Sequence, residues 1–136
     1  MSDAGIDIVG FLSQDALTDL LRSTKALLAP SLGGESFGMV LTRAFACATP
    51  VVASDIEGYR EVVTPETAVS VPAGDVSGLV TAVESLLTDE PCRAAMGAAA
   101  RQRAEEHFAW PDIARRLEEI YDRVTGRPRS AEVVAA

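Results

Sequence analysis

The stretch PSLGGESFG, residues 30–38, decides the fold of this chain, because it joins an apolar run at 26–29 to a segment with helical apolar spacing. This order predicts a short strand, a glycine-rich turn and then a helix. Unpaired backbone N–H groups and the positive end of a helix dipole meet at such a junction, which suits a phosphate, and Glu35 beside it could hold a hydroxyl-rich group. A plainer interpretation stays open, in which Gly33 and Gly34 only form a tight turn and Ser36 only caps the helix.

Outside this stretch the chain alternates between strand-like and helix-like apolar spacing. Strands are predicted at residues 6–11, 26–29, 51–55 and 69–71, with only a short helical turn within 57–64. Helices are predicted after Ser13, over 39–48, and in three segments beyond Asp75, of which the second starts at Pro91 and the third stops at Gly126. The alternation indicates an α/β domain with a parallel sheet and a helical C-terminal end, and ligands of such sheets lie at the carboxyl ends of the strands. We expect one domain over residues 1–126 and a disordered tail over 127–136.

The composition narrows the class of partner. A formal charge of −8, from 12 basic and 20 acidic residues, argues against nucleic acids and anionic membranes as general partners. Cys47 and Cys92 have no CxxC partner or suitably spaced histidine, so we expect reduced core thiols and no metal site. With neither a signal-peptide pattern nor a run of the roughly 18 apolar residues that a membrane helix needs, we expect a cytoplasmic protein without a membrane span.

Several motifs in a fixed order carry a family resemblance. Residues 30–41 (PSLGGESFGMVL) and 44–55 (AFACATPVVASD) resemble the donor-binding core of the retaining GT-B glycosyltransferases of family 4, such as the bacterial mannosyltransferases that act on phosphatidylinositol. Later landmarks at 58–63, 71–75 and 108–121 are similar to the same domain. The resemblance implies a partial Rossmann-like domain of about four mostly parallel strands with helices on both faces, belonging to the C-terminal, donor-binding part of such an enzyme.

The resemblance also implies roles for single residues. Glu35 matches the first glutamate of the family's Glu-x7-Glu motif, which contacts the donor sugar, and is the one residue to which it gives a catalytic role. Backbone amides at the helix start would stabilise the charge that builds on a departing nucleoside diphosphate. The implied donor-binding residues are Gly34, Glu35, Ser36, Phe37, Gly38 and Met39, with Gly10, Phe11 and Leu12 beside the base. Glu61 matches a landmark region and is equally well explained as a solvated or structural carboxylate.

The main departure from the family is Arg43. It stands eight residues after Glu35, where the family's second glutamate accepts hydrogen bonds from the ribose. Arginine has donors and no acceptor, so it could pair with a ribose oxygen or a phosphate without replacing the carboxylate. Alternatively, Arg43 forms a salt bridge with a nearby carboxylate such as Glu35. Lys25 and Ala68 depart from the family pattern as well.

The chain resembles only the later part of the donor domain. The acceptor domain, the first two strands of the donor domain and the Arg and Lys clamp on the diphosphate have no counterpart in it. We therefore expect weak donor binding, no activity of the isolated chain, and association with a partner chain that carries the acceptor domain or with a second copy. The strand at 6–11 is expected either to pair directly with the strand at 26–29 or to leave an edge through which two chains associate.

Two functions follow from these expectations. The first is the donor-binding portion of a retaining glycosyltransferase that uses a GDP- or UDP-hexose as substrate and needs no metal or other cofactor. The alternative is a noncatalytic remnant or interaction module that self-associates through the sheet edge, and a generic nucleotide-binding module is a third option. Whether the chain is itself an enzyme stays open at this point.

The side chains of four residues are expected to have structural or surface roles. Trp110 is predicted to anchor the core between the last two helices, and Met39 and Met96 to fill packing space. His107, the single histidine, lies near a predicted helix end without a nucleophile or metal partner at useful spacing, so a surface role is predicted.

Overall fold

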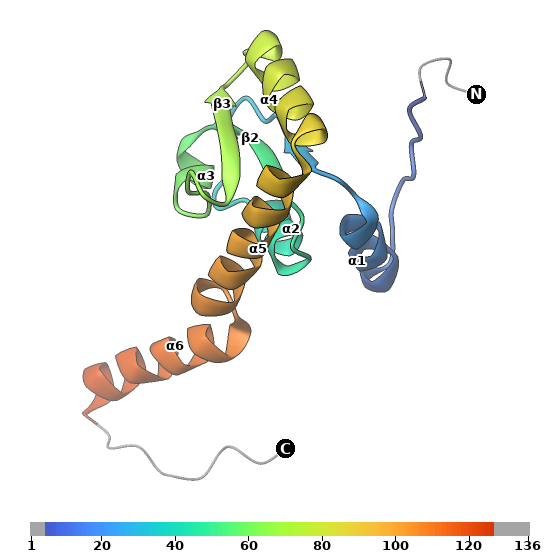
Figure 1. The fold of residues 1–136 in the computed structure, drawn as a ribbon. Helices are drawn as coiled ribbons and strands as arrows, with labels where there is room; N and C mark the ends of the chain where they lie inside the picture. The colour runs from blue at the N-terminus through green and yellow to red at the C-terminus, as the bar shows by residue number, and fades with distance from the viewer. Residues whose placement is uncertain (1–4, 127–136) are drawn as a thin grey trace.

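A three-stranded parallel sheet forms the centre of the molecule. The computed structural model describes residues 5–126. The strands β1 (Leu27–Ala29), β2 (Val51–Asp55) and β3 (Ala68–Pro72) lie in the order β1-β2-β3, with Leu27 opposite Val51 and Val51 opposite Ala68 (Figure 1). The predicted α/β fold with parallel strands is confirmed, with three strands among the described residues where about four were expected.

Six helices surround and extend the sheet. They are α1 (Gln14–Ser23), α2 (Met39–Ala46), α3 (Glu57–Arg60), α4 (Val76–Thr88), α5 (Glu90–His107) and α6 (Trp110–Thr125). Local signals explain several of their ends. The hydroxyl of Ser13 accepts from the Ala16 N–H at 3.2 Å, Asp89 accepts from the Cys92 N–H at 2.9 Å, and Gly126 ends α6 in the left-handed region at φ 64°.

The sheet is packed on both faces because successive residues of β2 point to opposite sides. Val51 and Ala53 lie in a core cluster with Phe45 of α2 and Ala100 of α5, and Val52 lies in a second cluster with Leu86 of α4. Helices therefore cover both faces, as predicted. The inner face of α5 is built from small residues, and a Cβ at Gly97 would overlap the carbonyl oxygen of Ala48.

The prediction of a strand at residues 6–11 is wrong. This segment forms no β ladder, and Figure 1 shows it running along the outside of α1, away from the sheet. Ile8 and Phe11 are 93% and 105% exposed. Apolar alternation alone does not make a strand, because a strand also needs a neighbouring backbone and a surface to pack on. The segment does not pair with β1, so β1 has one neighbour and an open edge within the described chain.

The predicted position of the last helix, α6, is confirmed, but the predicted burial of Trp110 at its start is wrong. Trp110 is 74% exposed, so it does not anchor a core, and no residue of α6 is buried. The apolar stripe that marks the helix in the sequence, which includes Leu117 and Ile120, faces solvent. Helical periodicity identifies a face that is suited to burial without saying whether another element covers it.

The remaining structural predictions have mixed outcomes. Met96 is buried as predicted, whereas Met39 is 54% exposed. Both cysteines are free thiols, but Cys92 is exposed and Cys47 only partly buried, so neither is a true core residue. His107 lies exposed at the end of α5, in agreement with its predicted surface role. The predicted tail at 127–136 lies outside the described residues, and within 5–126 no helix is both long and apolar enough to span a membrane.

Candidate functional site

The candidate site is the loop of residues 30–38 between β1 and α2, at the carboxyl end of β1. Gly33, Gly34 and Gly38 have φ values of 149°, 78° and 79°, which side chains rarely adopt, so glycine is needed for this path. The N-cap of α2 is Gly38, and no side chain in the described chain caps the helix. The hypothesis that Ser36 caps it is therefore wrong. No side chain accepts from the first N–H groups of α2, so these groups can donate to a ligand that binds at the loop.

Helix α3 supports this loop from behind. The backbone of Gly58 lies directly against the carbonyl of Glu35, so a Cβ at Gly58 would overlap that oxygen. The hydroxyl of Tyr59, a residue only 1% exposed, lies 3.0 Å from the hydroxyl of Ser31, and a Cβ at Gly38 would be 2.7 Å from the Tyr59 ring. These contacts fix the loop backbone at three points.

The supporting roles of Ser31 and Tyr59 are not evident in the sequence, and Gly58 matches only a landmark of the family there. The available signal was the Gly58-Tyr59 pair directly after the third predicted strand. A glycine beside a large aromatic residue in a short turn is typical of close backbone contact together with an inserted ring.

The predicted donor-binding residues of the loop lie together, and their side chains differ in exposure. Glu35 and Ser36 are exposed to solvent. Phe37 packs inward against the core and meets Phe108 edge to face at 5.7 Å between ring centroids. The side chain of Phe37 therefore anchors the loop to the core. Met39 begins α2 with an exposed side chain.

The turn after β3 lies beside the same loop. A Cβ at Gly74 would be 3.8 Å from the side chain of Leu32. Asp75, the N-cap of α4, accepts from the Gly78 N–H and the Ser77 hydroxyl at 2.9 Å each, and these hydrogen bonds, the Gly78 amide first, lower the pKa of its carboxyl. Two strand ends thus contribute to one edge of the molecule, as expected for a parallel sheet.

The carboxylate at the end of β2 is already engaged. Asp55 pairs with Arg60 of α3, with 2.7 Å between Oδ1 and Nε, and the hydrogen bond from Arg60 lowers the pKa of Asp55. Glu35 differs, since no ion pair or side-chain hydrogen bond engages it within residues 5–126. No group of three or more His, Cys, Asp or Glu side chains among the described residues could hold a metal ion.

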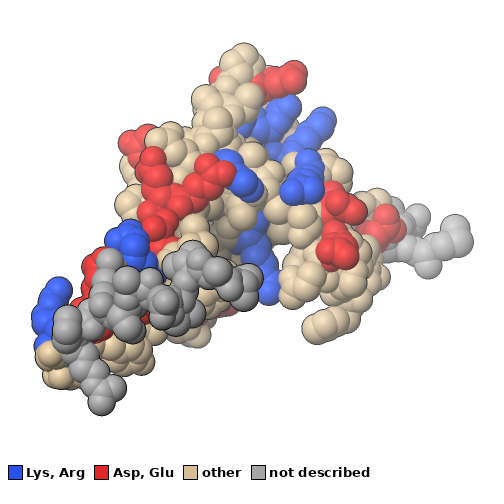
Figure 2. All heavy atoms as spheres, turned by 90° about the horizontal axis from the view of Figure 1, so that it is seen from below, with Lys and Arg blue, Asp and Glu red and all other residues tan. Residues whose placement is uncertain are grey.

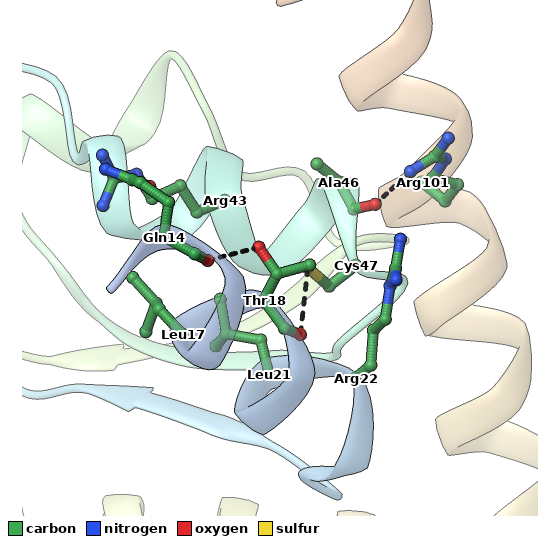
Figure 3. Close-up of a pocket in the computed structure, with 9 residues that line it drawn as sticks. All are labelled: Gln14, Leu17, Thr18, Leu21, Arg22, Arg43, Ala46, Cys47 and Arg101. Atoms are coloured by element: carbon green, nitrogen blue, oxygen red, sulfur yellow. Dashed lines mark hydrogen bonds between the residues drawn. The ribbon is translucent and has the colours of Figure 1, made fainter. Parts of the chain in front are cut away.

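Arg43 does not bind Glu35. It lies on the side of α2 that faces α1, where it lines a hollow with Gln14 and Thr18 (Figure 3). The predicted salt bridge with Glu35 is not formed in the described structure, so Arg43 leaves the Glu35 carboxylate open.

Gly10, Phe11 and Leu12 are not brought to the loop. They lie in the segment before α1, where Gly10 has φ 65° and a Cβ added to it would meet no atom within 4 Å. Glu61 has an exposed side chain, and its backbone carbonyl accepts from Arg103 at 2.8 Å. That arrangement agrees with the solvated, structural interpretation of Glu61.

Comparison with known proteins gives a match to one family and to several relatives. The family model described as "Glycosyl transferases group 1" matches residues 3–103. The chain is 36% identical over 116 residues to a phosphatidyl-myo-inositol mannosyltransferase of Mycobacterium leprae, covering 85% of this chain and 31% of the relative. It is 39% identical over 114 residues to a glycogen synthase of Mycobacterium tuberculosis, covering 83% of this chain and 27% of that relative.

Solved structures share the fold. The sucrose-phosphate synthase of Thermosynechococcus elongatus superposes with a TM-score of 0.81 at 31% identity, over 87% of this chain and 30% of that one. The Anabaena protein HepE, solved in complex with UDP, superposes with a TM-score of 0.73 at 23% identity, over 76% and 29%. At that identity the second likeness concerns the fold alone. The chain spans about 30% of the length of the relatives that it matches.

Proposed function

The chain belongs to the glycosyl transferases group 1 family, with the GT-B type of fold, and from this membership we propose that it is the donor-binding portion of a retaining glycosyltransferase. The described part of residues 1–126 would form an incomplete donor domain. The observation that carries the proposal is the uncapped start of α2 behind the Gly33-Gly34 turn, held in place by Gly58 and Tyr59.

The geometry suits a nucleotide sugar. The amides at the start of α2 supply donors for a diphosphate, and because the loop backbone is already fixed, they would need little reorganisation as charge builds on the leaving group. The exposed carboxylate of Glu35 supplies acceptors for sugar hydroxyls. We propose a GDP- or UDP-hexose as the donor. The name of one relative supports this choice, since it is a mannosyltransferase.

Binding should be weak and transfer should need more protein. Helix-end interactions contribute about 0.3 to 1 kcal/mol each, and about 2 kcal/mol in favourable, partly buried cases. Gly10 and Leu12 lie outside the loop in this structure, so contacts to the base would require the segment before α1 to move. Transfer would require an acceptor domain, which we propose lies on a partner chain.

Calorimetric titration with UDP, GDP, UDP-glucose and GDP-mannose tests the donor site. We expect saturable binding of at least one ligand in the millimolar range or tighter. In Glu35→Ala we expect a nucleotide sugar to lose the affinity that it gains over the nucleotide alone. Glu61→Ala is the matched control, because it removes the same charge from another exposed glutamate. The proposal fails if no ligand binds, or if both variants bind as the parent chain does.

Arg43 is proposed to mark a lost ribose contact. Arg43→Glu restores an acceptor at the family position, so we expect tighter binding of UDP and also of uridine, which has the ribose and no phosphate. An unchanged uridine affinity, measured by the same titration, would contradict this role.

Self-association through β1 is the second candidate function, and the open edge of the sheet favours it. The Leu27 N–H donates to the Pro50 carbonyl at 2.9 Å, toward β2. Because N–H groups alternate in direction along a strand, the Leu28 N–H points to the open edge of β1. Sedimentation velocity would show a dimer that dissociates in Leu28→Pro, which removes this outward donor. Leu28→Ala keeps the donor and should keep the dimer. A parent chain that sediments as a monomer at all concentrations excludes this function.

A further inference from the structure

The hollow that Arg43 lines lies at the junction of α1, α2 and α5. It has a volume of about 250 Å³ and is lined by side chains of all three helices. Three of them are arginines, one from each helix: Arg22, Arg43 and Arg101 (Figure 3). We call this hollow the arginine pocket.

The concentration of positive charge is unusual for this protein, whose formal charge is −8. Figure 2 shows basic side chains gathered over the middle of one face, with acidic side chains to either side. Among residues 5–126, no carboxylate forms an ion pair with Arg22 or Arg43. Arg101 is fixed, since it pairs with Glu105 at 2.7 Å and also donates to the Ala46 carbonyl. The Arg43 side chain extends to the Gln14 side of the hollow, apart from those of Arg22 and Arg101 (Figure 3), and of the three arginines only Arg101 forms an ion pair within residues 5–126.

The chemistry of the lining selects the class of ligand. Guanidinium groups present planar pairs of donors that match phosphate oxygens, and neighbouring like charges are relieved by a multivalent anion. The Thr18 hydroxyl already donates to the Gln14 carbonyl at 2.8 Å, and Leu17 and Leu21 form an apolar wall, so the unused donors are those of the arginines. The volume lies below the roughly 300–1,000 Å³ of sites for drug-sized ligands, so a small anion fits better than a whole nucleotide sugar.

The arginine pocket is separate from the loop of residues 30–38. The loop precedes α2 at its amino end, whereas Ala46 and Cys47, which line the pocket, stand at its carboxyl end. Arg22 and Arg101 belong to neither the loop nor the elements that support it. We propose that the arginine pocket binds the phosphate or diphosphate group of a small molecule through Arg22 and Arg101, independently of the nucleotide-sugar site.

Titration with pyrophosphate at low ionic strength tests this proposal, followed by NMR on the arginine Nε–H signals. We expect saturable shifts of Arg22 and Arg101. Arg22→Gln should weaken binding about fivefold, the equivalent of about 1 kcal/mol for a solvent-exposed charge pair, and added salt should weaken it further. The matched control is Arg123→Gln on α6, which removes one charge far from the pocket and should change nothing. Equal weakening in both variants, or shifts that do not saturate, would show adventitious charge screening and overturn the proposal.

Two further arms separate this site from the proposed donor site and identify the source of the phosphate. Glu35→Ala should leave pyrophosphate binding intact, and Arg22→Gln should leave UDP-sugar binding intact. Loss of UDP-sugar binding in Arg22→Gln would mean that the pocket belongs to the donor site, which contradicts independence. Glycerol phosphate binding more tightly than inorganic phosphate would indicate an organic phosphate, and the reverse order would indicate the free ion.

Discussion

Single close contacts set the path of the loop that carries Glu35. Gly58 adopts an ordinary backbone conformation, so the conformational freedom of glycine is not needed there. What matters is the absence of a Cβ, because it allows α3 to lie against the Glu35 carbonyl. Tyr59 fills the room behind the loop and bonds Ser31. The residues proposed to face a ligand and the residues that hold the backbone are therefore different.

Gly58→Ala should displace the loop as well as destabilise the fold. The added methyl group would overlap the Glu35 carbonyl, and overpacking of this kind typically costs about 1 to 3 kcal/mol. Urea denaturation measures the loss in the free energy of unfolding, and calorimetry measures nucleotide-sugar binding.

Gly97→Ala is the matched variant for this experiment. There the methyl group would overlap the Ala48 carbonyl, which lies between α2 and α5 and away from the loop. We expect it to destabilise the protein to a similar degree and to leave donor binding unchanged. If both variants lose donor binding equally, the effect of Gly58→Ala is one of global stability, and α3 has no specific supporting role.

At the scale of residues, the positions proposed to face a ligand stand out in the sequence, whereas the residues that support the loop do not. Gly34, Glu35 and Gly38 were found through the turn chemistry of glycine and through motif order. Tyr59 was missed because its role depends on a contact with Ser31, 28 positions away in the sequence, which periodicity cannot reveal. Arg43 stands out in the sequence by its spacing from Glu35, but the direction of its side chain, toward α1, depends on how two helices pack.

Elements with local capping signals agree most closely with the sequence. Ser13 and Asp75 begin their helices as predicted, and Gly126 ends the last one. The strand expected at 6–11 is the clear failure. Caps are local, so the sequence specifies them, whereas a strand exists only with a partner that its own residues do not supply.

The cap of α4 should make the stability of the protein depend on acidic pH. The folded-state pKa of Asp75 is lowered, chiefly by the Gly78 amide and then by the Ser77 hydroxyl, so its contribution is present above the unfolded pKa of about 4. That contribution is lost as the pH falls through the lower, folded pKa.

Thermal unfolding of Asp75→Asn measured from neutral to acidic pH checks this sign. Asparagine also caps helices well, so the variant should resemble the parent chain at low pH and lose part of the parent's gain in Tm on going to neutral pH. Asp15→Asn, which changes an exposed carboxylate in the first turn of α1, is the control. An identical pH dependence of the parent chain and Asp75→Asn would contradict the role given to this carboxylate.

On the scale of the whole molecule, stability is unevenly distributed. Val51, Val52 and Ala53 in β2 are fully buried between two helical layers, whereas α6 buries none of its residues. The chain spans about 30% of its relatives, all of which contain further polypeptide. The family and the α/β fold could be predicted from the sequence, whereas the exposure of α6 and of residues 6–11 could not.

Hydrogen exchange should reflect this distribution. We expect the amides of β2 to exchange most slowly, at the rate of global unfolding, and those of α6 to exchange much faster through local opening. Mass spectrometry of peptides from the two regions measures the difference. Equal protection of α6 and β2 in a monomeric sample would contradict the exposure of α6.

The central claim is that the loop of residues 30–38 and the start of α2 bind a nucleotide sugar. The most direct measurement is amide chemical-shift mapping during titration with UDP-glucose and GDP-mannose. We expect saturable shifts concentrated at the amides of Gly34, Ser36, Gly38 and Met39, and we expect the shifts that depend on the sugar to be lost in Glu35→Ala. Saturable shifts confined to other parts of the chain, or no shifts at millimolar ligand, would contradict it.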